Sequence, residues 1–385
     1  MTTTGKIEGE GTGLTRHASG NPDRPHDEVN LSTKAFWSAT MDEREQSFAV
    51  LRRERPITWQ RAFEDQLLDD PGDHGYWAIT THRHLVEVTR RPRDFLSGPG
   101  ILMENVPAEL VESAQSIIGM DPPRHTQLRR LMTSAFTPKQ MRRIEDRIKA
   151  NATKVVDNLI EKAEASPDGW VDFVEECGGL LPMHNFNDMM GVPDGVRQKT
   201  SHETMVLTAW NDPEYTGETK EEVLTAMFNA IVYMHELGKQ TVADRRENPR
   251  DDLFTALAQA EIDGEKLTDH EIGSFFVLLT IAGNDTTRQS LAHGLRALTT
   301  HPEQRAWLVA DLESRTRTAT EEIVRWATPI MTFRRTAARD CELDGVQITE
   351  GDKVVLFYSS ANRDSGAIGN FFHVVKRMPC KPFAG

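Results

Sequence analysis

The pattern of hydrophobic and polar positions has a helical period in one part of the chain and a strand-like period in others. Between about residues 124 and 310, apolar residues recur at helical spacing in long amphipathic segments. Residues 55–61 and 74–82 instead combine aromatic and β-branched residues between Gly and Pro, a pattern typical of short strands. Residues 331–364 alternate and turn, which predicts a small mixed sheet. The predicted fold is therefore mainly α with a minor β region.

Proline and threonine mark several predicted helix ends. Pro123 stands just before one helix, and Thr137 with Pro138 forms a cap and first-turn pair for the next. Pro329 ends a further helix that begins near residue 317. These boundaries give a large helical body followed by the small sheet.

Composition narrows the class of protein. Of 385 residues, 38% are hydrophobic and 27% charged, as expected of a globular protein, and no stretch approaches the ~20 apolar residues of a membrane span. The first 20 residues lack the apolar core of a signal peptide. The net charge of −14 argues against nucleic acid as a partner. Three scattered cysteines favour a reducing, cytoplasmic setting over a disulfide framework.

One predicted helix, residues 272–302, contains an unusual polar stretch. Ala282 and Gly283 are followed by Asp285 and Thr286. Gly inside a helix costs about 1 kcal/mol relative to Ala, and buried Asp and Thr need hydrogen-bonding partners. One interpretation is a kink satisfied by side-chain-to-backbone hydrogen bonds. The other is that the small pair opens space for a flat ligand while the acid and alcohol supply a proton path. The residues alone leave both open.

Two charged pairs carry weaker signals. His125 and Arg129 are four residues apart, so they share a helix face that suits carboxylates or phosphates. A solvated basic face is the more common explanation of such a pair. Glu322 and Arg325 have the spacing of an intrahelical ion pair, usually worth a few tenths of a kcal/mol at a surface. Neither pair identifies a function by itself.

The order and spacing of these groups resemble the bacterial cytochrome P450 family, the haem-thiolate monooxygenases. "AGNDTT" resembles the family's oxygen-activating helix motif and "EEIVR" its E-x-x-R helix. "DPPRHTQLRRLMTSAFTP" resembles its propionate-binding helix, and "FRRTAARDCELDGVQITEGDKVVLFYSSANRD" its β region. The resemblance runs from about residue 30 to Asp364 and implies a cytochrome P450-like fold.

The resemblance implies a haem b cofactor and the residues that hold it. His125, Arg129 and Arg335 are expected to hydrogen-bond the haem propionates. Ala282 and Gly283 are expected to let the helix approach the porphyrin. Without the resemblance, Arg334 and Arg335 are equally ambiguous, since both lie in a strand-like stretch.

The resemblance also implies catalytic and structural roles. Thr286 is expected to hold the water network that delivers protons to dioxygen, and Asp285 to relay protons from solvent. Glu322 and Arg325 are expected to be structural, completed by an arginine further along the chain. The implied reaction inserts one oxygen atom from dioxygen into a C–H bond, with electrons from a ferredoxin.

The resemblance places the substrate pocket in residues 96–118 and about 180–235. These segments supply a largely apolar set of side chains, namely Leu102, Met103, Val106, Ile117, Met205 and Trp210. The motifs look most like those of members that act on sterols, terpenoids or branched lipids. A small apolar substrate is therefore expected.

After Asp364 the sequence departs from the family pattern. The family continues to F-x-x-G-x-x-x-C-x-G, whose cysteine binds the iron, but here His373 and Lys376 take the Phe and Gly positions before Cys380. Cys380 is therefore not expected to be a ligand. None of the 59 acidic residues lies after Asp364. A shifted reading frame explains this change better than a basic tail.

Three segments are expected: a disordered lead-in over 1–28, an incomplete cytochrome P450 domain over 29–364, and a tail over 365–385 that does not belong to the family. With its ligand-loop motif and last helix missing, the chain is expected to be inactive as a monooxygenase. The alternatives are a haem-free, non-catalytic binding protein of this fold and a truncated product without function.

Overall fold

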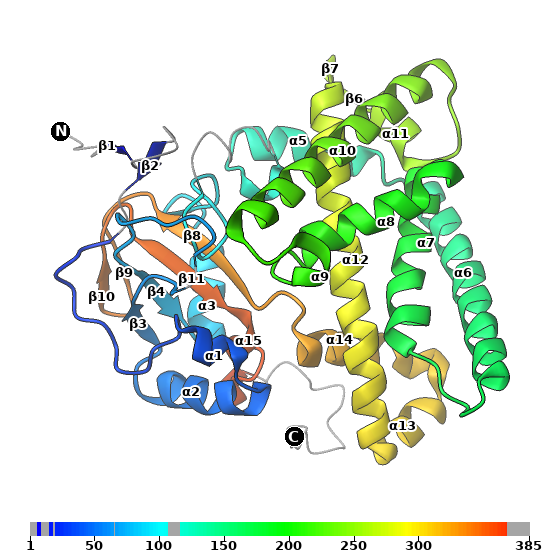
Figure 1. Ribbon diagram of the computed structural model, residues 1–385. Helices are drawn as coiled ribbons and strands as arrows, with labels where there is room; N and C mark the ends of the chain where they lie inside the picture. The colour runs from blue at the N-terminus through cyan, green and yellow to red at the C-terminus, as the bar shows by residue number, and fades with distance from the viewer. Residues whose placement is uncertain (1–5, 9–14, 18–19, 65, 107–115, 368–385) are drawn as a thin grey trace. The chain divides into compact units, whose positions relative to one another are not determined.

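The chain forms two compact units, each with its own core (Figure 1). The sheet unit comprises residues 1–121 and 303–385, and the helical unit comprises residues 122–302. The computed structural model describes residues 6–8, 15–17, 20–64, 66–106 and 116–367.

The sheet unit contains most of the strands. Its elements in chain order are β1 (Lys6–Glu8), β2 (Thr15–His17), α1 (Lys34–Ser38), α2 (Met41–Glu54), β3 (Ile57–Gln60), β4 (Tyr76–Ile79), α3 (His82–Thr89), β5 (Phe95–Leu96), the 3-10 turn η1 (Ile117–Gly119), α13 (Pro302–Val309), α14 (Leu312–Ala327), β8 (Thr332–Ala337), β9 (Cys341–Leu343), β10 (Val346–Ile348), β11 (Lys353–Phe357) and α15 (Tyr358–Ala361). Helix α13 begins at the last residue of the helical unit.

A five-stranded sheet in the order β3-β4-β11-β8-β5 organises this unit. Strands β11 and β4 are parallel, and the other neighbours are antiparallel. Strand side chains alternate between faces, so Trp77 and Ile79 join one apolar cluster while Tyr76 and Ala78 join another. Both faces are therefore buried, which explains why β4 and β11 consist almost entirely of buried residues.

The helical unit consists of long helices and one small hairpin. Its elements are α5 (Arg124–Ser134), α6 (Pro138–Ala165), the π-helical turn η2 (Val174–Gly179), α7 (Leu180–Met190), α8 (Asp194–Thr208), α9 (Pro213–Thr216), α10 (Lys220–Glu247), α11 (Leu253–Gln259), β6 (Glu261–Ile262), β7 (Glu265–Lys266) and α12 (Asp269–Thr300).

Helices α10 and α12 pack closely where both carry glycine. A Cβ built on Gly238 would lie 3.0 Å from the Cα of Gly273 and 3.3 Å from the Cβ of Phe276. Since these atoms belong to the backbone or the base of a side chain, they cannot easily move aside. The two glycines therefore set how closely the helix axes approach.

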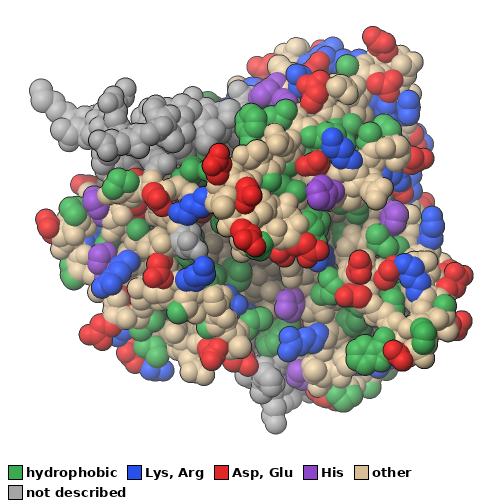
Figure 2. All heavy atoms as spheres, in the orientation of Figure 1, with side chains coloured by type: hydrophobic (Ala, Val, Ile, Leu, Met, Phe, Trp, Pro, Cys, Tyr) green, Lys and Arg blue, Asp and Glu red, His purple; other side chains and the backbone are tan. Residues whose placement is uncertain are grey.

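The predicted class and most predicted elements are confirmed: the chain is mainly helical with small sheets. The strands predicted at 55–61 and 74–82 are β3 and β4. Thr137 caps α6 by accepting a hydrogen bond from the Gln140 N–H, as its position before Pro138 predicted. Figure 2 shows acidic side chains interspersed with Lys and Arg over the face drawn, as expected of this composition.

The segment boundaries at residues 28 and 364 stay predictions, and most of the predicted tail lies outside the described residues. Within the predicted lead-in, β1 pairs with β2, and Arg24 makes ordered contacts. The Arg24 guanidinium lies 2.8 Å from the Asp352 carboxylate and 4.3 Å from the centre of the Trp59 ring. A cation stacked on an aromatic face and paired with an acid attaches this part of the segment to the sheet, while the disorder expected of the lead-in stays a prediction.

Candidate functional site

The polar stretch of α12 does not break the helix. The Thr286 hydroxyl donates to the Ala282 carbonyl at 2.6 Å, and the Thr287 hydroxyl donates to the Gly283 carbonyl at 3.0 Å. Each threonine thus satisfies its own donor one turn back, and α12 runs continuously from Asp269 to Thr300. Side-chain-to-backbone bonding therefore occurs, but without the interruption that the sequence suggested.

The same turn of α12 carries an open face. Ala282 and Gly283 are exposed, although they lie in the middle of a 32-residue helix. A Cβ added at Gly283 would meet no atom within 4 Å outside its own helix backbone, while Asn284 is buried and donates to the Thr280 carbonyl at 2.7 Å. Half-buried Asp285 completes the turn. An exposed small pair and adjacent polar groups thus occur on the same turn, while their role toward a flat ligand stays a prediction.

Helix α5 presents the two predicted propionate donors. Its inner side buries Leu128 and Leu131, while His125 is half-buried and Arg129 is exposed. Residues four apart lie above one another on a helix, so the two side chains share a face. An ion pair between Arg124 and Glu271, in the first turn of α12, connects the two helices. The face provides nitrogen donors to an anionic group.

Glu322 and Arg325 form the expected ion pair on α14. The Arg325 Nε and Nη2 atoms donate to the two carboxylate oxygens of Glu322 at 2.7 and 2.6 Å. Nη1 donates to the Asn362 carbonyl at 2.6 Å. Both side chains are largely buried, so this bidentate pair fixes α14 to the segment after β11. The predicted arginine partner stays a prediction.

The adjacent arginines of β8 have different surroundings. Arg334 is buried, whereas Arg335 is half-buried and donates to the Arg334 carbonyl at 2.8 Å. Burial raises the pKa of Tyr358, and the positive charge of Arg335 partly offsets that rise. Neighbouring residues of a strand point to opposite faces, so only one of the two arginines can serve the cofactor predicted from the sequence.

Two of the three cysteines lie in the described part of the chain. Cys177 is buried in η2, and Cys341 is half-buried in β9. Burial raises the pKa of both thiols, which disfavours the thiolate that binds a metal. Cys380 lies outside the described residues. The open face and the nitrogen donors thus fit a haem, whereas neither described cysteine fits its axial ligand.

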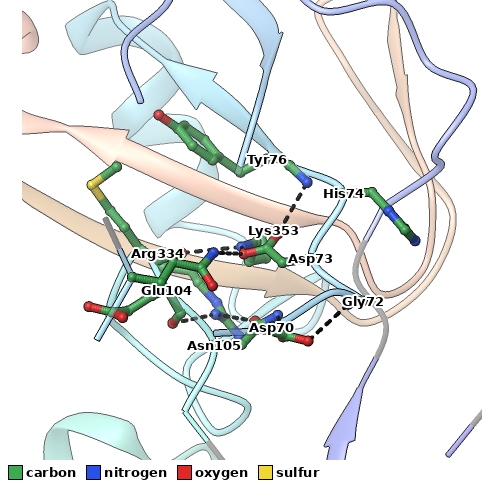
Figure 3. A network of polar contacts seen from close by, with 12 residues as sticks. Asp70, Gly72, Asp73, His74, Tyr76, Glu104, Asn105, Arg334 and Lys353 are labelled. Carbon is green, nitrogen blue, oxygen red and sulfur yellow. Dashed lines mark hydrogen bonds and ion pairs between the residues drawn. The ribbon is translucent and has the colours of Figure 1, made fainter. Parts of the chain in front are cut away.

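Sequence reasoning missed a buried polar network beneath β8 and β11 (Figure 3). Lys353 and Arg334 are both buried, and Lys353 is paired with the buried carboxylate of Asp73. Asn105 joins the network by accepting from Arg334 at 2.8 Å. The available signal was a lysine that opens the apolar strand "KVVLF". From the sequence alone, such a lysine is interpreted as an exposed residue at the end of a strand, because its acidic partner lies 280 residues away.

Comparison with known proteins identifies the family of the chain. The sequence model of the family described as "Cytochrome P450" matches residues 71–367. This chain belongs to the cytochrome P450 family. Its relatives in this family are monooxygenases, the family cofactor is haem b, and the predicted P450 fold is confirmed.

Two curated relatives and one solved structure illustrate the similarity. The methyl-branched lipid omega-hydroxylase of Mycobacterium tuberculosis is 39% identical over 343 residues, covering 89% of this chain and 78% of that protein. The steroid C26-monooxygenase of Mycolicibacterium smegmatis is 38% identical over 330 residues, covering 83% and 72%. A Mycobacterium marinum cytochrome P450 solved with pseudoionone is 51% identical with a TM-score of 0.82, covering 89% and 81%.

Among the described residues, no helix combines the length and the apolar character needed to cross a membrane.

Proposed function

We propose that this chain represents a cytochrome P450 lineage that inserts one oxygen atom from dioxygen into a C–H bond of an apolar, lipid-, sterol- or terpenoid-like substrate. A ferredoxin-type protein would supply the electrons. The observation that carries this proposal is the open Ala282–Gly283 face of α12, with Asp285 and Thr286 in the same turn. The relatives named for lipid and steroid oxidation support the substrate class.

In this proposal, His125, Arg129 and Arg335 hold the haem propionates, and Ala282 with Gly283 leaves room for the ring. The haem, when bound, supplies the activation of dioxygen. These side chains contribute position and charge, because a charge-assisted hydrogen bond to a carboxylate is about twice as strong as a neutral one.

Thr286 and Asp285 would control protons at the open face. The Thr286 hydroxyl already donates to the Ala282 carbonyl, so its oxygen lone pairs remain to accept a hydrogen bond from water. A water held at Oγ1 in this way has its other proton available for transfer. The half-buried Asp285 carboxylate can take a proton from solvent and pass it on.

The proposed substrate residues lie in both units. In the sheet unit, Leu102 is exposed and Met103 packs against the cluster around Phe357. In the helical unit, Met205 and Trp210 are half-buried on and just after α8. Each unit thus supplies apolar side chains, which favours a substrate with little hydrogen-bonding capacity.

We further propose that this chain does not form a thiolate-ligated haem. A haem-free binding protein of the same fold is therefore the second candidate function. The main observation behind this proposal is that His373 and Lys376 stand where the family motif before the cysteine has Phe and Gly. The raised thiol pKa values of Cys177 and Cys341 agree with it. The purified chain, reduced and exposed to carbon monoxide, is expected to lack the red-shifted Soret band of a thiolate-ligated haem.

The appearance of that band would overturn this second proposal. In that case Cys380→Ser should abolish the band, while Cys177→Ser and Cys341→Ser, the matched controls, should leave it intact. Purified chain that contains no haem but still binds an apolar probe would support the binding-protein candidate.

A further inference from the structure

The segment Pro99–Asn105, here called the carbonyl segment, is held by two buried cations. The Arg334 guanidinium donates to the carbonyls of Pro99 at 3.1 Å and Glu104 at 3.0 Å. The Arg334 backbone N–H donates to the Ile101 carbonyl at 2.9 Å. The Lys353 ammonium donates to the Met103 carbonyl at 3.3 Å. Four carbonyls of one irregular loop thus accept hydrogen bonds from β8 and β11.

Side-chain hydrogen bonds connect the carbonyl segment and the two cations to further polar residues. The Asn105 amide accepts from Arg334 at 2.8 Å and donates to the Asp70 carboxylate at 2.7 Å. Asp73 pairs with Lys353 and also accepts from the Gln66 amide at 2.9 Å. Figure 3 shows Arg334 and Lys353 converging on this group from neighbouring strands.

Arg334 and Lys353 can stay buried and charged only while their hydrogen-bonding partners keep these positions. Burial lowers the pKa of Arg334 to about 10 and that of Lys353 to about 8, and the negative charges of Asp73 and Asp70 offset part of each shift. A buried charge is tolerated only when it is paired and its donors are satisfied. The Arg334 Nε–H has no hydrogen-bond partner among the described residues, so the carbonyls that accept from its two Nη atoms and from Lys353 are needed to keep these cations buried, and they are in place only while the carbonyl segment keeps its path.

The loop is shaped to fit the guanidinium. Gly100 has φ of +138°, which L side chains rarely adopt, and a Cβ there would lie 3.2 Å from Arg334 Nη2. Upstream, the Asp121 carboxylate accepts from the N–H groups of Ser97 at 2.9 Å and Gly98 at 2.7 Å. The segment is therefore attached at its start and along its length.

We propose that Arg334 is a positioning residue that presents Leu102 to the substrate, an inference that rests on the proposed function. Leu102 is 53% exposed and lies between the held carbonyls of Ile101 and Met103. These bonds hold the peptide unit before Leu102 and the peptide unit after Met103, which restricts the direction of the Leu102 side chain. Arg334 thus acts on substrate affinity through the loop, while Arg335 is left for the haem.

The first test measures hydrogen–deuterium exchange in the full chain and needs neither haem nor substrate. Arg334→Lys keeps the charge but cannot replace a planar group that reaches Pro99 and Glu104 together. We expect the amides of Ser97, Gly98, Gly100, Ile101 and position 334 to exchange at least about tenfold faster, with α12 unchanged. Arg339→Lys is the matched control, because Arg339 is 66% exposed on its side chain and pairs with Asp94 instead.

Asn105→Ala is a milder variant in case Arg334→Lys does not fold. It removes one acceptor from Arg334 and should accelerate the same amides about threefold. Unchanged exchange in folded Arg334→Lys, or equal acceleration throughout the sheet unit, would overturn the proposal that Arg334 holds the segment.

The second test measures the binding of pseudoionone to the same proteins by equilibrium dialysis. Arg334→Lys and Leu102→Ala are each expected to weaken binding about five- to tenfold, and their combination should weaken it little further because they act through one contact. Binding that Arg334→Lys leaves unchanged would overturn the positioning role. If the unaltered chain binds no pseudoionone, the proposed substrate class fails for this probe, while the exchange result still decides whether Arg334 holds the segment.

Discussion

At the residue scale, Lys353 is a buried cation with a strongly lowered pKa. It is buried at the start of β11, and burial, with Arg334 nearby, lowers its pKa to about 8 although the Asp73 carboxylate favours the charged form. Removing one partner of such a buried pair destabilises the fold, whereas replacing both partners by neutral groups changes the stability little. The effect of the pair should therefore be visible as a pH dependence of the unfolding free energy.

We predict that this dependence appears between pH 8 and about 10.5. The folded pKa of Lys353 lies below the unfolded value of 10.5, so in this window the unfolded chain binds more protons. The contribution of Lys353 to the unfolding free energy is then least favourable below pH 8. It should rise with pH by up to about 3 kcal/mol, at roughly 1.4 kcal/mol per pKa unit.

The measurement is urea unfolding across this range, compared with the double variant Lys353→Met/Asp73→Asn, which lacks the titrating pair. The unfolding free energy of the natural chain should rise relative to the variant above pH 8. Parallel pH profiles for the two proteins would contradict the assignment.

The proposed role of Thr286 can be tested against a matched control. The neighbouring Thr287 hydroxyl also donates to the carbonyl four residues earlier in the helix. In a chain that carries a complete ligand region, Thr286→Ala should divert reducing equivalents into peroxide, because the water proposed to bind at Oγ1 would lose its partner. Thr287→Ala should divert fewer, since it removes only the bond to the Gly283 carbonyl. Both variants should unfold within about 0.5 kcal/mol of the parent, because alanine favours helix. Peroxide yields that are equal in all three proteins would exclude the role of Thr286.

At the element scale, the predictable parts were those with local signals. Helix α6 followed from Thr137 and Pro138, and the end of α14 from Pro329. Helix α2 was overlooked, although Thr40 and Glu43 form a capping box that the sequence displays. The π-helical turn η2 has no comparable signal, because a wide turn depends on what packs against it. Local chemistry thus predicts where helices begin, whereas irregular turns require tertiary contacts.

The close packing of α10 against α12 can be tested by adding a single methyl group in a Gly→Ala substitution. Gly238→Ala gains about 1 kcal/mol of helix propensity but forces a Cβ to within 3.0 Å of the Gly273 Cα. Overpacking of this kind typically costs about 1–3 kcal/mol, so we predict a net loss of about 1 kcal/mol in unfolding free energy.

Gly195→Ala on α8 is the matched control, since a Cβ there would meet nothing within 4 Å. It should leave the unfolding free energy unchanged or raise it by up to about 1 kcal/mol. If both alanine variants shift the thermal midpoint in the same direction, the glycine contact does not limit packing.

At the scale of the whole molecule, the sequence offered candidates for the site but none for the buried network of Arg334 and Lys353. His125 with Arg129, and Ala282 with Gly283, could be proposed because each of two motifs places its own members within a few residues of one another. Arg334 and Lys353 were missed because their partners come from residues 70–105, far away in the sequence. Burial and pairing at such separations follow only from the folded sheet.

The last prediction concerns residues 365–385. The family match ends at residue 367, within three residues of Asp364, and no acidic residue follows Asp364. Gradual divergence would blur such a boundary and would also alter "AGNDTT" or "EEIVR", yet both motifs are intact. A small insertion or deletion in the coding DNA leaves upstream residues untouched and changes every residue downstream.

We therefore predict that an alternative frame after the Asp364 codon encodes F-x-x-G-x-x-x-C-x-G and a closing helix. That frame should also encode an arginine to join the Glu322–Arg325 pair, whose Arg325 now reaches the Asn362 carbonyl. Sequencing the DNA tests this directly, and the corrected chain should show the thiolate-type carbon monoxide spectrum that the present chain is expected to lack. If neither alternative frame contains the cysteine loop, the frameshift explanation is wrong, and a P450 relative without a thiolate ligand becomes the better account.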